Sequence, residues 1–149
     1  MKLRGGFVSN SSSSSFFIPL DKWGSTKELA KYMLDVQEES WRNHRCSKED
    51  MEALRQWREN LEIAVDDNPN VSFPSCNFDT YITKITRGGK EYLYVATCNN
   101  EQWDLSEDSV IPEDADGSVY DGEYDEEYVY GNEFLRLDTG LKEKKTRGW

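Results

Sequence analysis

The apolar residues of this chain change their spacing near Pro74, from the period of a helix to the period of a strand. Before that point, Leu29, Met33 and Val36 recur at the spacing of one helical face. After it, the stretch 78–85 is rich in β-branched and aromatic residues, which are typical of strands. Helices followed by strands in one chain favour an α+β fold, in which each kind of element buries its apolar face against the other.

Two capping signals predict where the helices begin. Residues 25–28, STKE, have the form of a capping box, in which the serine hydroxyl accepts a hydrogen bond from the third helical N–H group. Residues 47–50, SKED, repeat the signal with a shorter acidic side chain in the fourth place. The second apolar face runs from Met51 through Val65, and the stretch 66–69, DDNP, is expected to end the helix. Because the link between the two helices is short and polar, we expect an antiparallel pair.

A double glycine at residues 88–89 separates two strand-like stretches, 78–85 and 91–97. Glycine adopts the positive φ values that tight hairpin turns require, so we predict an antiparallel hairpin here. Gly and Asp interrupt the apolar residues of the later segments, which makes further strands harder to delimit. The other stretches with strand-like composition are 16–18, 119–120, 128–130 and 134–137.

With 149 residues, the chain has the length of one domain and can bury a core without disulfides or metals. We expect an antiparallel helix pair packed on a hairpin-based antiparallel sheet, with an acidic Tyr-rich C-terminal region. The expected order is a Ser-rich N-terminal strand or segment (1–20), the helix pair (25–67), the hairpin (71–98), and an acidic region with a basic tail (101–149).

Charge is segregated along the chain, whose net charge is −11. Residues 101–134 contain thirteen carboxylates and no Lys or Arg, whereas the remainder holds slightly more basic than acidic residues. A field of this sign repels a phosphate backbone, so we expect no direct nucleic-acid binding by this region. The sign then reverses in a basic tail, whose cations are Arg136, Lys142, Lys144, Lys145 and Arg147.

Two hypotheses explain the acidic stretch: a solvated loop that folds back onto the basic tail, or a docking surface for a basic protein partner. Its tyrosines suit a protein interface, where rings supply contact area and charges steer the partner, but they equally suit packing of an acidic C-terminal sheet. The candidate protein-binding residues are Asp121, Glu123, Tyr124, Asp125, Glu126, Glu127 and Tyr128.

A run of five serines stands between two apolar pairs near the N-terminus. Its members are Ser11, Ser12, Ser13, Ser14 and Ser15. Serine hydroxyls stabilise turns by bonding nearby backbone groups, and successive N–H groups in such turns can cradle an anion. Accessible serines also accept phosphate or serve as a short recognition tag. The alternative is a polar terminal strand without any such role.

Residues 4–16, RGGFVSNSSSSSF, resemble an N-terminal signature, roughly R-x-G-F-V-S-N-S-S-S-S-S-F, of many otherwise dissimilar uncharacterised proteins of tailed bacteriophages and some bacteria. Every fixed position of the signature is matched, and Gly5 stands at its variable place. The resemblance implies a phage accessory or virion protein, and it favours a shared address or modification site in the serine run. It implies no activity.

Three cysteines and the single histidine add up to a tetrahedral zinc set: His44, Cys46, Cys76 and Cys98. No two of the cysteines have the spacing of a chelating knuckle, and an odd number at wide spacing fits free thiols in a reducing compartment. The same residues offer His44 and Cys46 as a nucleophile pair, but no third group is placed to orient them. We therefore expect no cofactor and no stoichiometric zinc.

A calcium loop is a further hypothesis. Asp114, Asp116 and Ser118 place oxygen ligands at alternate positions, as many calcium loops do. Val119 stands where the loop requires Gly, and no clear helices flank the stretch. An acidic, turn-rich loop is the simpler interpretation.

These observations favour a phage-encoded accessory protein that acts without catalysis, by binding a host or phage protein through an acidic, aromatic surface. The alternatives are a virion component that docks through its Ser-rich segment, and a small metal- or thiol-dependent enzyme. No apolar run approaches the roughly 20 residues that span a bilayer, and the N-terminus lacks the apolar stretch of a signal peptide. We therefore expect the host cytoplasm, or alternatively the virion, and no membrane partner.

Overall fold

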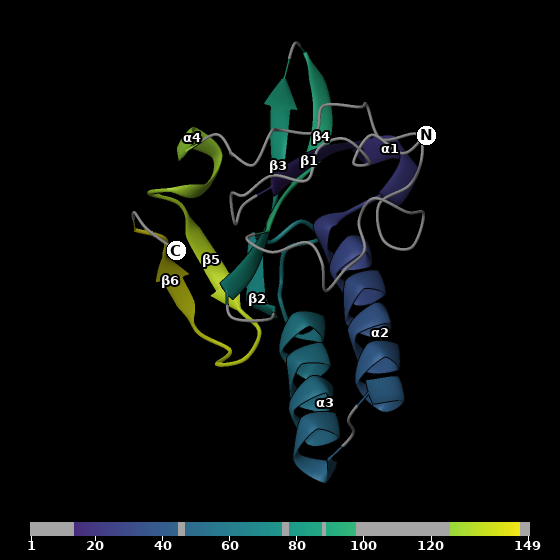
Figure 1. Cartoon of the computed structure of the whole chain (residues 1–149). Coiled ribbons are helices and arrows are strands. Elements are labelled where there is room, and N and C mark those ends of the chain that lie inside the picture. The colour runs from purple at the N-terminus through teal and green to yellow at the C-terminus, as the bar shows by residue number, and fades with distance from the viewer. Residues whose placement is uncertain (1–13, 45–46, 76–77, 88, 98–125, 147–149) are drawn as a thin grey trace.

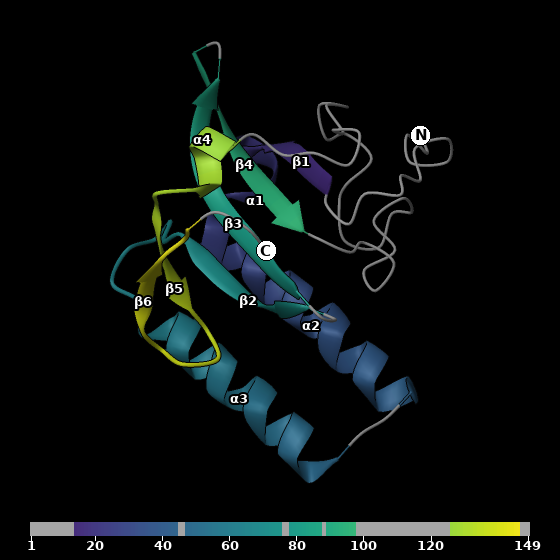
Figure 2. The ribbon, with the colours of Figure 1, turned by 60° about the vertical axis from the view of Figure 1, so that its left-hand side comes forward.

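The computed structural model describes residues 14–44, 47–75, 78–87, 89–97 and 126–146 (Figure 1). A six-stranded sheet lies against a pair of long helices, as Figure 2 shows from the side. The helices are α1 (Leu20–Trp23), α2 (Thr26–His44), α3 (Lys48–Glu62) and α4 (Glu126–Val129). The strands are β1 (Ser14–Pro19), β2 (Val71–Ser75), β3 (Phe78–Arg87), β4 (Lys90–Thr97), β5 (Glu133–Arg136) and β6 (Lys142–Lys144).

The strand order is β1-β4-β3-β2-β5-β6, and the β3–β4 hairpin forms its centre. Every pairing is antiparallel except that of β2 with β5, which is parallel and makes the sheet mixed. The helix pair, which is antiparallel in Figure 1, and the sheet confirm the α+β fold expected from the sequence. The expectation of a wholly antiparallel sheet is wrong, because β2 and β5 pair in parallel.

Both predicted helix starts are confirmed. The N–H of Glu28 donates to Ser25 Oγ at 3.1 Å, and the N–H of Asp50 donates to Ser47 Oγ at 3.0 Å. Each serine thus satisfies one N–H group that the first helical turn leaves without an intrahelical partner.

The predicted end of the second helix is wrong. Helix α3 ends at Glu62, and Val65, expected on its apolar face, has 98% of its surface exposed. The amine of Lys27 on α2 donates a hydrogen bond to the carbonyl of Ala64 at 2.7 Å. The N–H of Ala64 donates to the carbonyl of Leu61 at 3.2 Å. Because Lys27 satisfies the Ala64 carbonyl just beyond the helix end, the chain can leave the helix there and return as β2.

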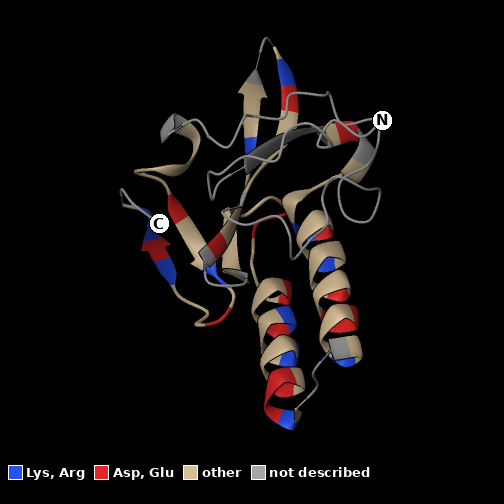
Figure 3. Ribbon diagram, in the orientation of Figure 1, with Lys and Arg blue, Asp and Glu red and all other residues tan. Residues whose placement is uncertain are grey.

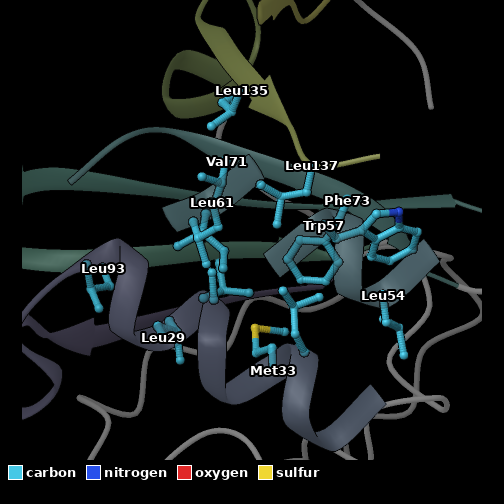
Figure 4. Packing of buried hydrophobic residues seen from close by; sticks show 14 of the residues in the cluster. Leu29, Met33, Leu54, Trp57, Leu61, Val71, Phe73, Leu93, Leu135 and Leu137 are labelled. Atoms are coloured by element: carbon cyan, nitrogen blue, oxygen red, sulfur yellow. The ribbon is translucent and has the colours of Figure 1, made fainter. Parts of the chain in front are cut away.

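The main core fills the space between the helix pair and the sheet (Figure 4). Its largest fully buried side chains include Phe73 from β2 and Leu29 and Met33 from α2. A smaller cluster lies on the opposite face of the sheet, because successive strand residues point to opposite faces. This second cluster consists of Tyr81, Ile85, Tyr94, Ala96, Val129 and Phe134.

Strand β2 was not predicted, because Pro74 lies within it. The parallel ladder with β5 runs from Leu135 N–H to Asn70 O at 2.8 Å and from Leu137 N–H to Ser72 O at 2.9 Å. The next donor in this ladder would be residue 74, which as proline has no N–H. The carbonyl of Leu137 instead accepts from Asn60 Nδ2 on α3 at 2.8 Å, so the proline leaves no buried acceptor without a partner.

The remaining strand predictions have mixed outcomes. Residues 134–137 contribute most of β5, and residues 16–18 lie in β1, as expected. Residues 128–130 do not form a strand: Tyr128 and Val129 end the helical turn α4, and Tyr130 lies in the turn that follows. Asn132 Nδ2 donates to the Tyr128 carbonyl at 2.8 Å, and Gly131 has φ of 85°, a left-handed conformation that ends a helical turn. The stretch 119–120 lies outside the described residues.

Candidate functional site

The structure describes the end of the predicted protein-binding surface. Asp121, Glu123, Tyr124 and Asp125 lie outside the described residues, and Glu126 and Glu127 begin α4. The half-buried Tyr128 packs its ring on Tyr94, with the ring centroids 5.0 Å apart.

Both attachment points of the acidic stretch belong to the same sheet. The strand before it, β4, ends at Thr97, which is paired with both Thr80 and Ser14. Near its other end, the turn α4 inserts Val129 into the smaller apolar cluster, where this side chain is fully buried. Phe134 follows on β5, is 1% exposed and packs its ring edge-on against Tyr81.

The other predicted sites lie mostly beyond the described ranges. Ser14 and Ser15 belong to β1 and pair with Thr97 and Ala96, whereas Ser11, Ser12 and Ser13 are not described. Cys46, Cys76, Cys98, Asp114, Asp116 and Ser118 are likewise outside, and His44 is the last residue of α2. Within the described ranges, no three His, Cys, Asp or Glu residues are grouped as metal ligands. The zinc and calcium hypotheses therefore remain predictions.

Arg136 forms an ion-pair cluster that the sequence did not reveal. Its guanidinium donates to Asp79 through Nη1 at 2.9 Å and Nη2 at 3.2 Å, and to Asp138 through Nε at 3.2 Å and Nη2 at 3.3 Å. Burial by itself lowers the pKa of Arg136, but the two carboxylates outweigh burial and hold this pKa above its ordinary value. The guanidinium is thus permanently charged and already occupied by carboxylates.

Lys145 and Tyr81 extend this cluster. The Lys145 amine lies 5.5 Å from the centroid of the Tyr81 ring and 5.4 Å from that of Tyr130, within the range of cation–π attraction. Tyr81 donates its hydroxyl proton to Asp79 at 3.3 Å. Burial, and then the negative charge of Asp79, raise the pKa of Tyr81 above its ordinary value, so this phenol remains protonated at neutral pH.

A polar cavity of about 170 Å³ lies at this cluster. It is lined by Ser72, Asp79, Tyr81, Phe134, Arg136, Glu143, Lys144, Lys145 and Thr146. The cations here are Arg136, Lys144 and Lys145, and the carboxylates of Asp79, Glu143 and the neighbouring Asp138 balance their charge. Arg136 binds two of these carboxylates, Asp79 and Asp138. We interpret the cluster as a structural link between β3 and β5 rather than as an anion site.

The helix pair carries charges of both signs, as Figure 3 shows. Arg58 on α3 reaches Asp35 at 2.6 Å and Glu38 at 2.7 Å on α2, and Glu38 also accepts from Arg42 at 2.8 Å. The hydrogen bond from Arg58 is the main reason that the pKa of Glu38 is lowered. Arginine side chains therefore compensate part of the negative charge of the helix surface.

Comparison of the chain with protein-family models, with curated proteins and with solved structures finds no match in any of the three. Within the described ranges, no helix is long and apolar enough to cross a bilayer.

Proposed function

We propose that this chain is a phage-encoded accessory protein that acts without catalysis, by binding a basic host or phage protein through the acidic, tyrosine-containing stretch 101–134. The observation that carries the proposal is the attachment of this stretch to the sheet. It leaves the sheet after Thr97 and returns through Val129 and Phe134, which are 0% and 1% exposed. The resemblance of residues 4–16 to the phage signature supports the origin.

Anchoring both ends of an acidic segment favours its use as a binding surface. The ends of the segment are held together by the fold, so binding a partner does not have to supply the entropy of that closure. Its carboxylates attract a basic surface over the screening length of roughly 8 Å in physiological salt. Tyr128 supports the base of the segment by packing on Tyr94, which leaves Tyr124 as the aromatic candidate for direct contact.

Part of the basic tail already has partners, which favours the docking hypothesis over a loop folded back on the tail. Arg136 is saturated by Asp79 and Asp138, and the Lys145 amine lies beside the rings of Tyr81 and Tyr130. These two cations are therefore less available to pair with the carboxylates of the acidic stretch.

The proposal is tested by affinity capture from phage-infected cells with the full chain as bait, followed by binding kinetics with the recovered partner. In the test variant, neutral amides replace five carboxylates: Asp121→Asn, Glu123→Gln, Asp125→Asn, Glu126→Gln and Glu127→Gln. The matched control neutralises five exposed carboxylates of the helix pair: Glu39→Gln, Glu49→Gln, Glu52→Gln, Glu59→Gln and Glu62→Gln. Association should slow markedly in the test variant and with rising salt, whereas dissociation should change less, since it depends on buried aromatic contacts.

An unchanged association rate of the test variant at low salt would show that the acidic stretch is only a solvated surface. Mass spectrometry of purified virions tests the alternative, in which the chain is a virion component. Presence of the chain in particles, together with capture of no host protein, would favour a virion component.

A further inference from the structure

The polar cavity beside the Arg136 cluster contains a buried hydroxyl that has no hydrogen bond. Ser72 is fully buried and lines this cavity, and no atom of the described residues forms a hydrogen bond with its Oγ. Its neighbours on β2, Val71 and Phe73, both belong to the main core. Because successive strand residues face opposite sides of a sheet, the Ser72 side chain lies on the cavity side, level with Tyr81 in the β2–β3 register.

The size of the cavity and the state of this hydroxyl both point to a bound molecule. A buried polar group without a hydrogen bond is rare in native structures and costs free energy, so such a group calls for a binding partner. The cavity volume is about 170 Å³, whereas about 10–15 Å³ is enough for one water. The cavity therefore has room for a small molecule.

Two exposed side chains of opposite charge stand at the same cavity. Glu143 and Lys144 on β6 both line it, and neither forms an ion pair in the part of the chain that the structure describes. Glu143 lies opposite Phe134 in the β5–β6 register, so both side chains are on the cavity side of the sheet. A ligand in the cavity can thus meet one carboxylate and one ammonium group.

The other charged groups of the cavity already have partners. Arg136 binds Asp79 and Asp138, and the Lys145 amine lies over the Tyr81 ring. Since the three cations and three carboxylates of this region balance, the cavity has no net preference for an anion or a cation. It favours a ligand that carries both charges.

We propose that this cavity binds a small zwitterion, an α-amino acid with a short polar side chain. Its carboxylate binds Lys144, its ammonium group binds Glu143, and its side chain forms a hydrogen bond with Ser72 Oγ. Charge-assisted hydrogen bonds of this kind are stronger than neutral ones. A simple anion satisfies only the lysine and a simple cation only the glutamate, whereas the zwitterion satisfies both and also the buried hydroxyl.

The first experiment titrates the full chain with each of the protein amino acids, and separately with inorganic phosphate, while NMR follows the backbone amide signals. Serine, threonine or asparagine should bind with a Kd of about 1 mM or below and shift the signals of Ser72, Glu143 and Lys144. Two analogues of the best ligand test the charges: its amide lacks the carboxylate, and its N-acetyl form lacks the ammonium group. Each analogue should bind about tenfold more weakly.

Three variants test the contacts. Ser72→Ala, Glu143→Gln and Lys144→Gln should each weaken binding of the amino acid by about tenfold. The matched control is Lys142→Gln, because Lys142 is also exposed on β6 but does not line this cavity; its affinity should be unchanged. Lys144→Gln and the unaltered chain should bind the amide analogue equally, because this analogue has no carboxylate for the lysine. Ser72→Ala should fold, since it removes a hydroxyl without a hydrogen bond among the described residues.

Failure of every amino acid to bind at concentrations up to about 10 mM would overturn the proposal and leave the cavity to water. Tighter binding of phosphate than of any amino acid would show an anion site instead. Unchanged affinity in all three variants would place the ligand elsewhere and refute the assignment. The test uses neither a protein partner nor the carboxylates of the acidic stretch, so its outcome is independent of the proposed function.

Discussion

Replacing Arg136 by methionine removes the cation of the ion-pair cluster and leaves an apolar stem of similar length. The register of β2 with β5 includes only two residue pairs, Val71 with Leu135 and Ser72 with Arg136. The link from Arg136 to Asp79 on β3 therefore contributes to holding the β5–β6 hairpin on the sheet. Without the guanidinium, Asp79 and Asp138 both lose the cation that they bind.

The expected loss follows from the burial of the three partners. Arg136 exposes 15% of its side chain, Asp79 30% and Asp138 28%. Breaking a fully buried ion pair costs about 3–5 kcal/mol, and an exposed pair contributes about 0–1 kcal/mol. Because the arginine is nearly buried while both carboxylates keep contact with solvent, we expect Arg136→Met to lower the free energy of unfolding by about 2–3 kcal/mol. For a chain of this size, this loss corresponds to a decrease of roughly 6–9 °C in Tm.

Urea unfolding followed by tryptophan fluorescence measures this free energy through the midpoint and slope of the transition. Arg42→Met is the matched control, because Arg42 exposes 62% of its side chain and pairs with Glu38 one helical turn away. This control should lose only about 0.3–0.5 kcal/mol. If Arg136→Met lost no more than the control, the cluster would behave as a surface ion pair and its structural role would be refuted.

Three further measurements test the fold. Amides of the β3–β4 hairpin should exchange more slowly than those of α2 and α3, because both strands are paired on each side; faster exchange in the hairpin would contradict its central place. Gly89→Val should lower the free energy of unfolding by about 1–2 kcal/mol, because Gly89 has φ of 81°; Gly89→Asn should lose less, and equal losses would argue against the turn geometry. Ser72→Ala should leave that free energy unchanged or raise it by up to about 1 kcal/mol, because the buried Ser72 Oγ has no hydrogen-bond partner among the described residues; a loss above about 1 kcal/mol in urea unfolding would reveal one elsewhere in the chain.

The elements predicted correctly from sequence have signals confined to a few neighbouring residues. The capping serines at positions 25 and 47 act on N–H groups three residues away, and the double glycine turn joins adjacent strands. The end of α3 was misjudged because it depends on Lys27 of the other helix. The turn at 128–130 was misjudged because Asn132 and Gly131 decide its conformation against the strand-like composition of the stretch.

Sequence alone determined the helix starts, the central hairpin and the segregation of charge that motivates the proposed binding surface, because propensity, capping and charge are properties of neighbouring residues. Only the tertiary structure decided the parallel pairing of β2 with β5 and the Arg136 cluster. Arg136 meets Asp79 across 57 positions of sequence, and Asn60 donates to the carbonyl of Leu137 across 77. Such contacts depend on the register and packing of whole elements, and no local pattern of residues encodes them.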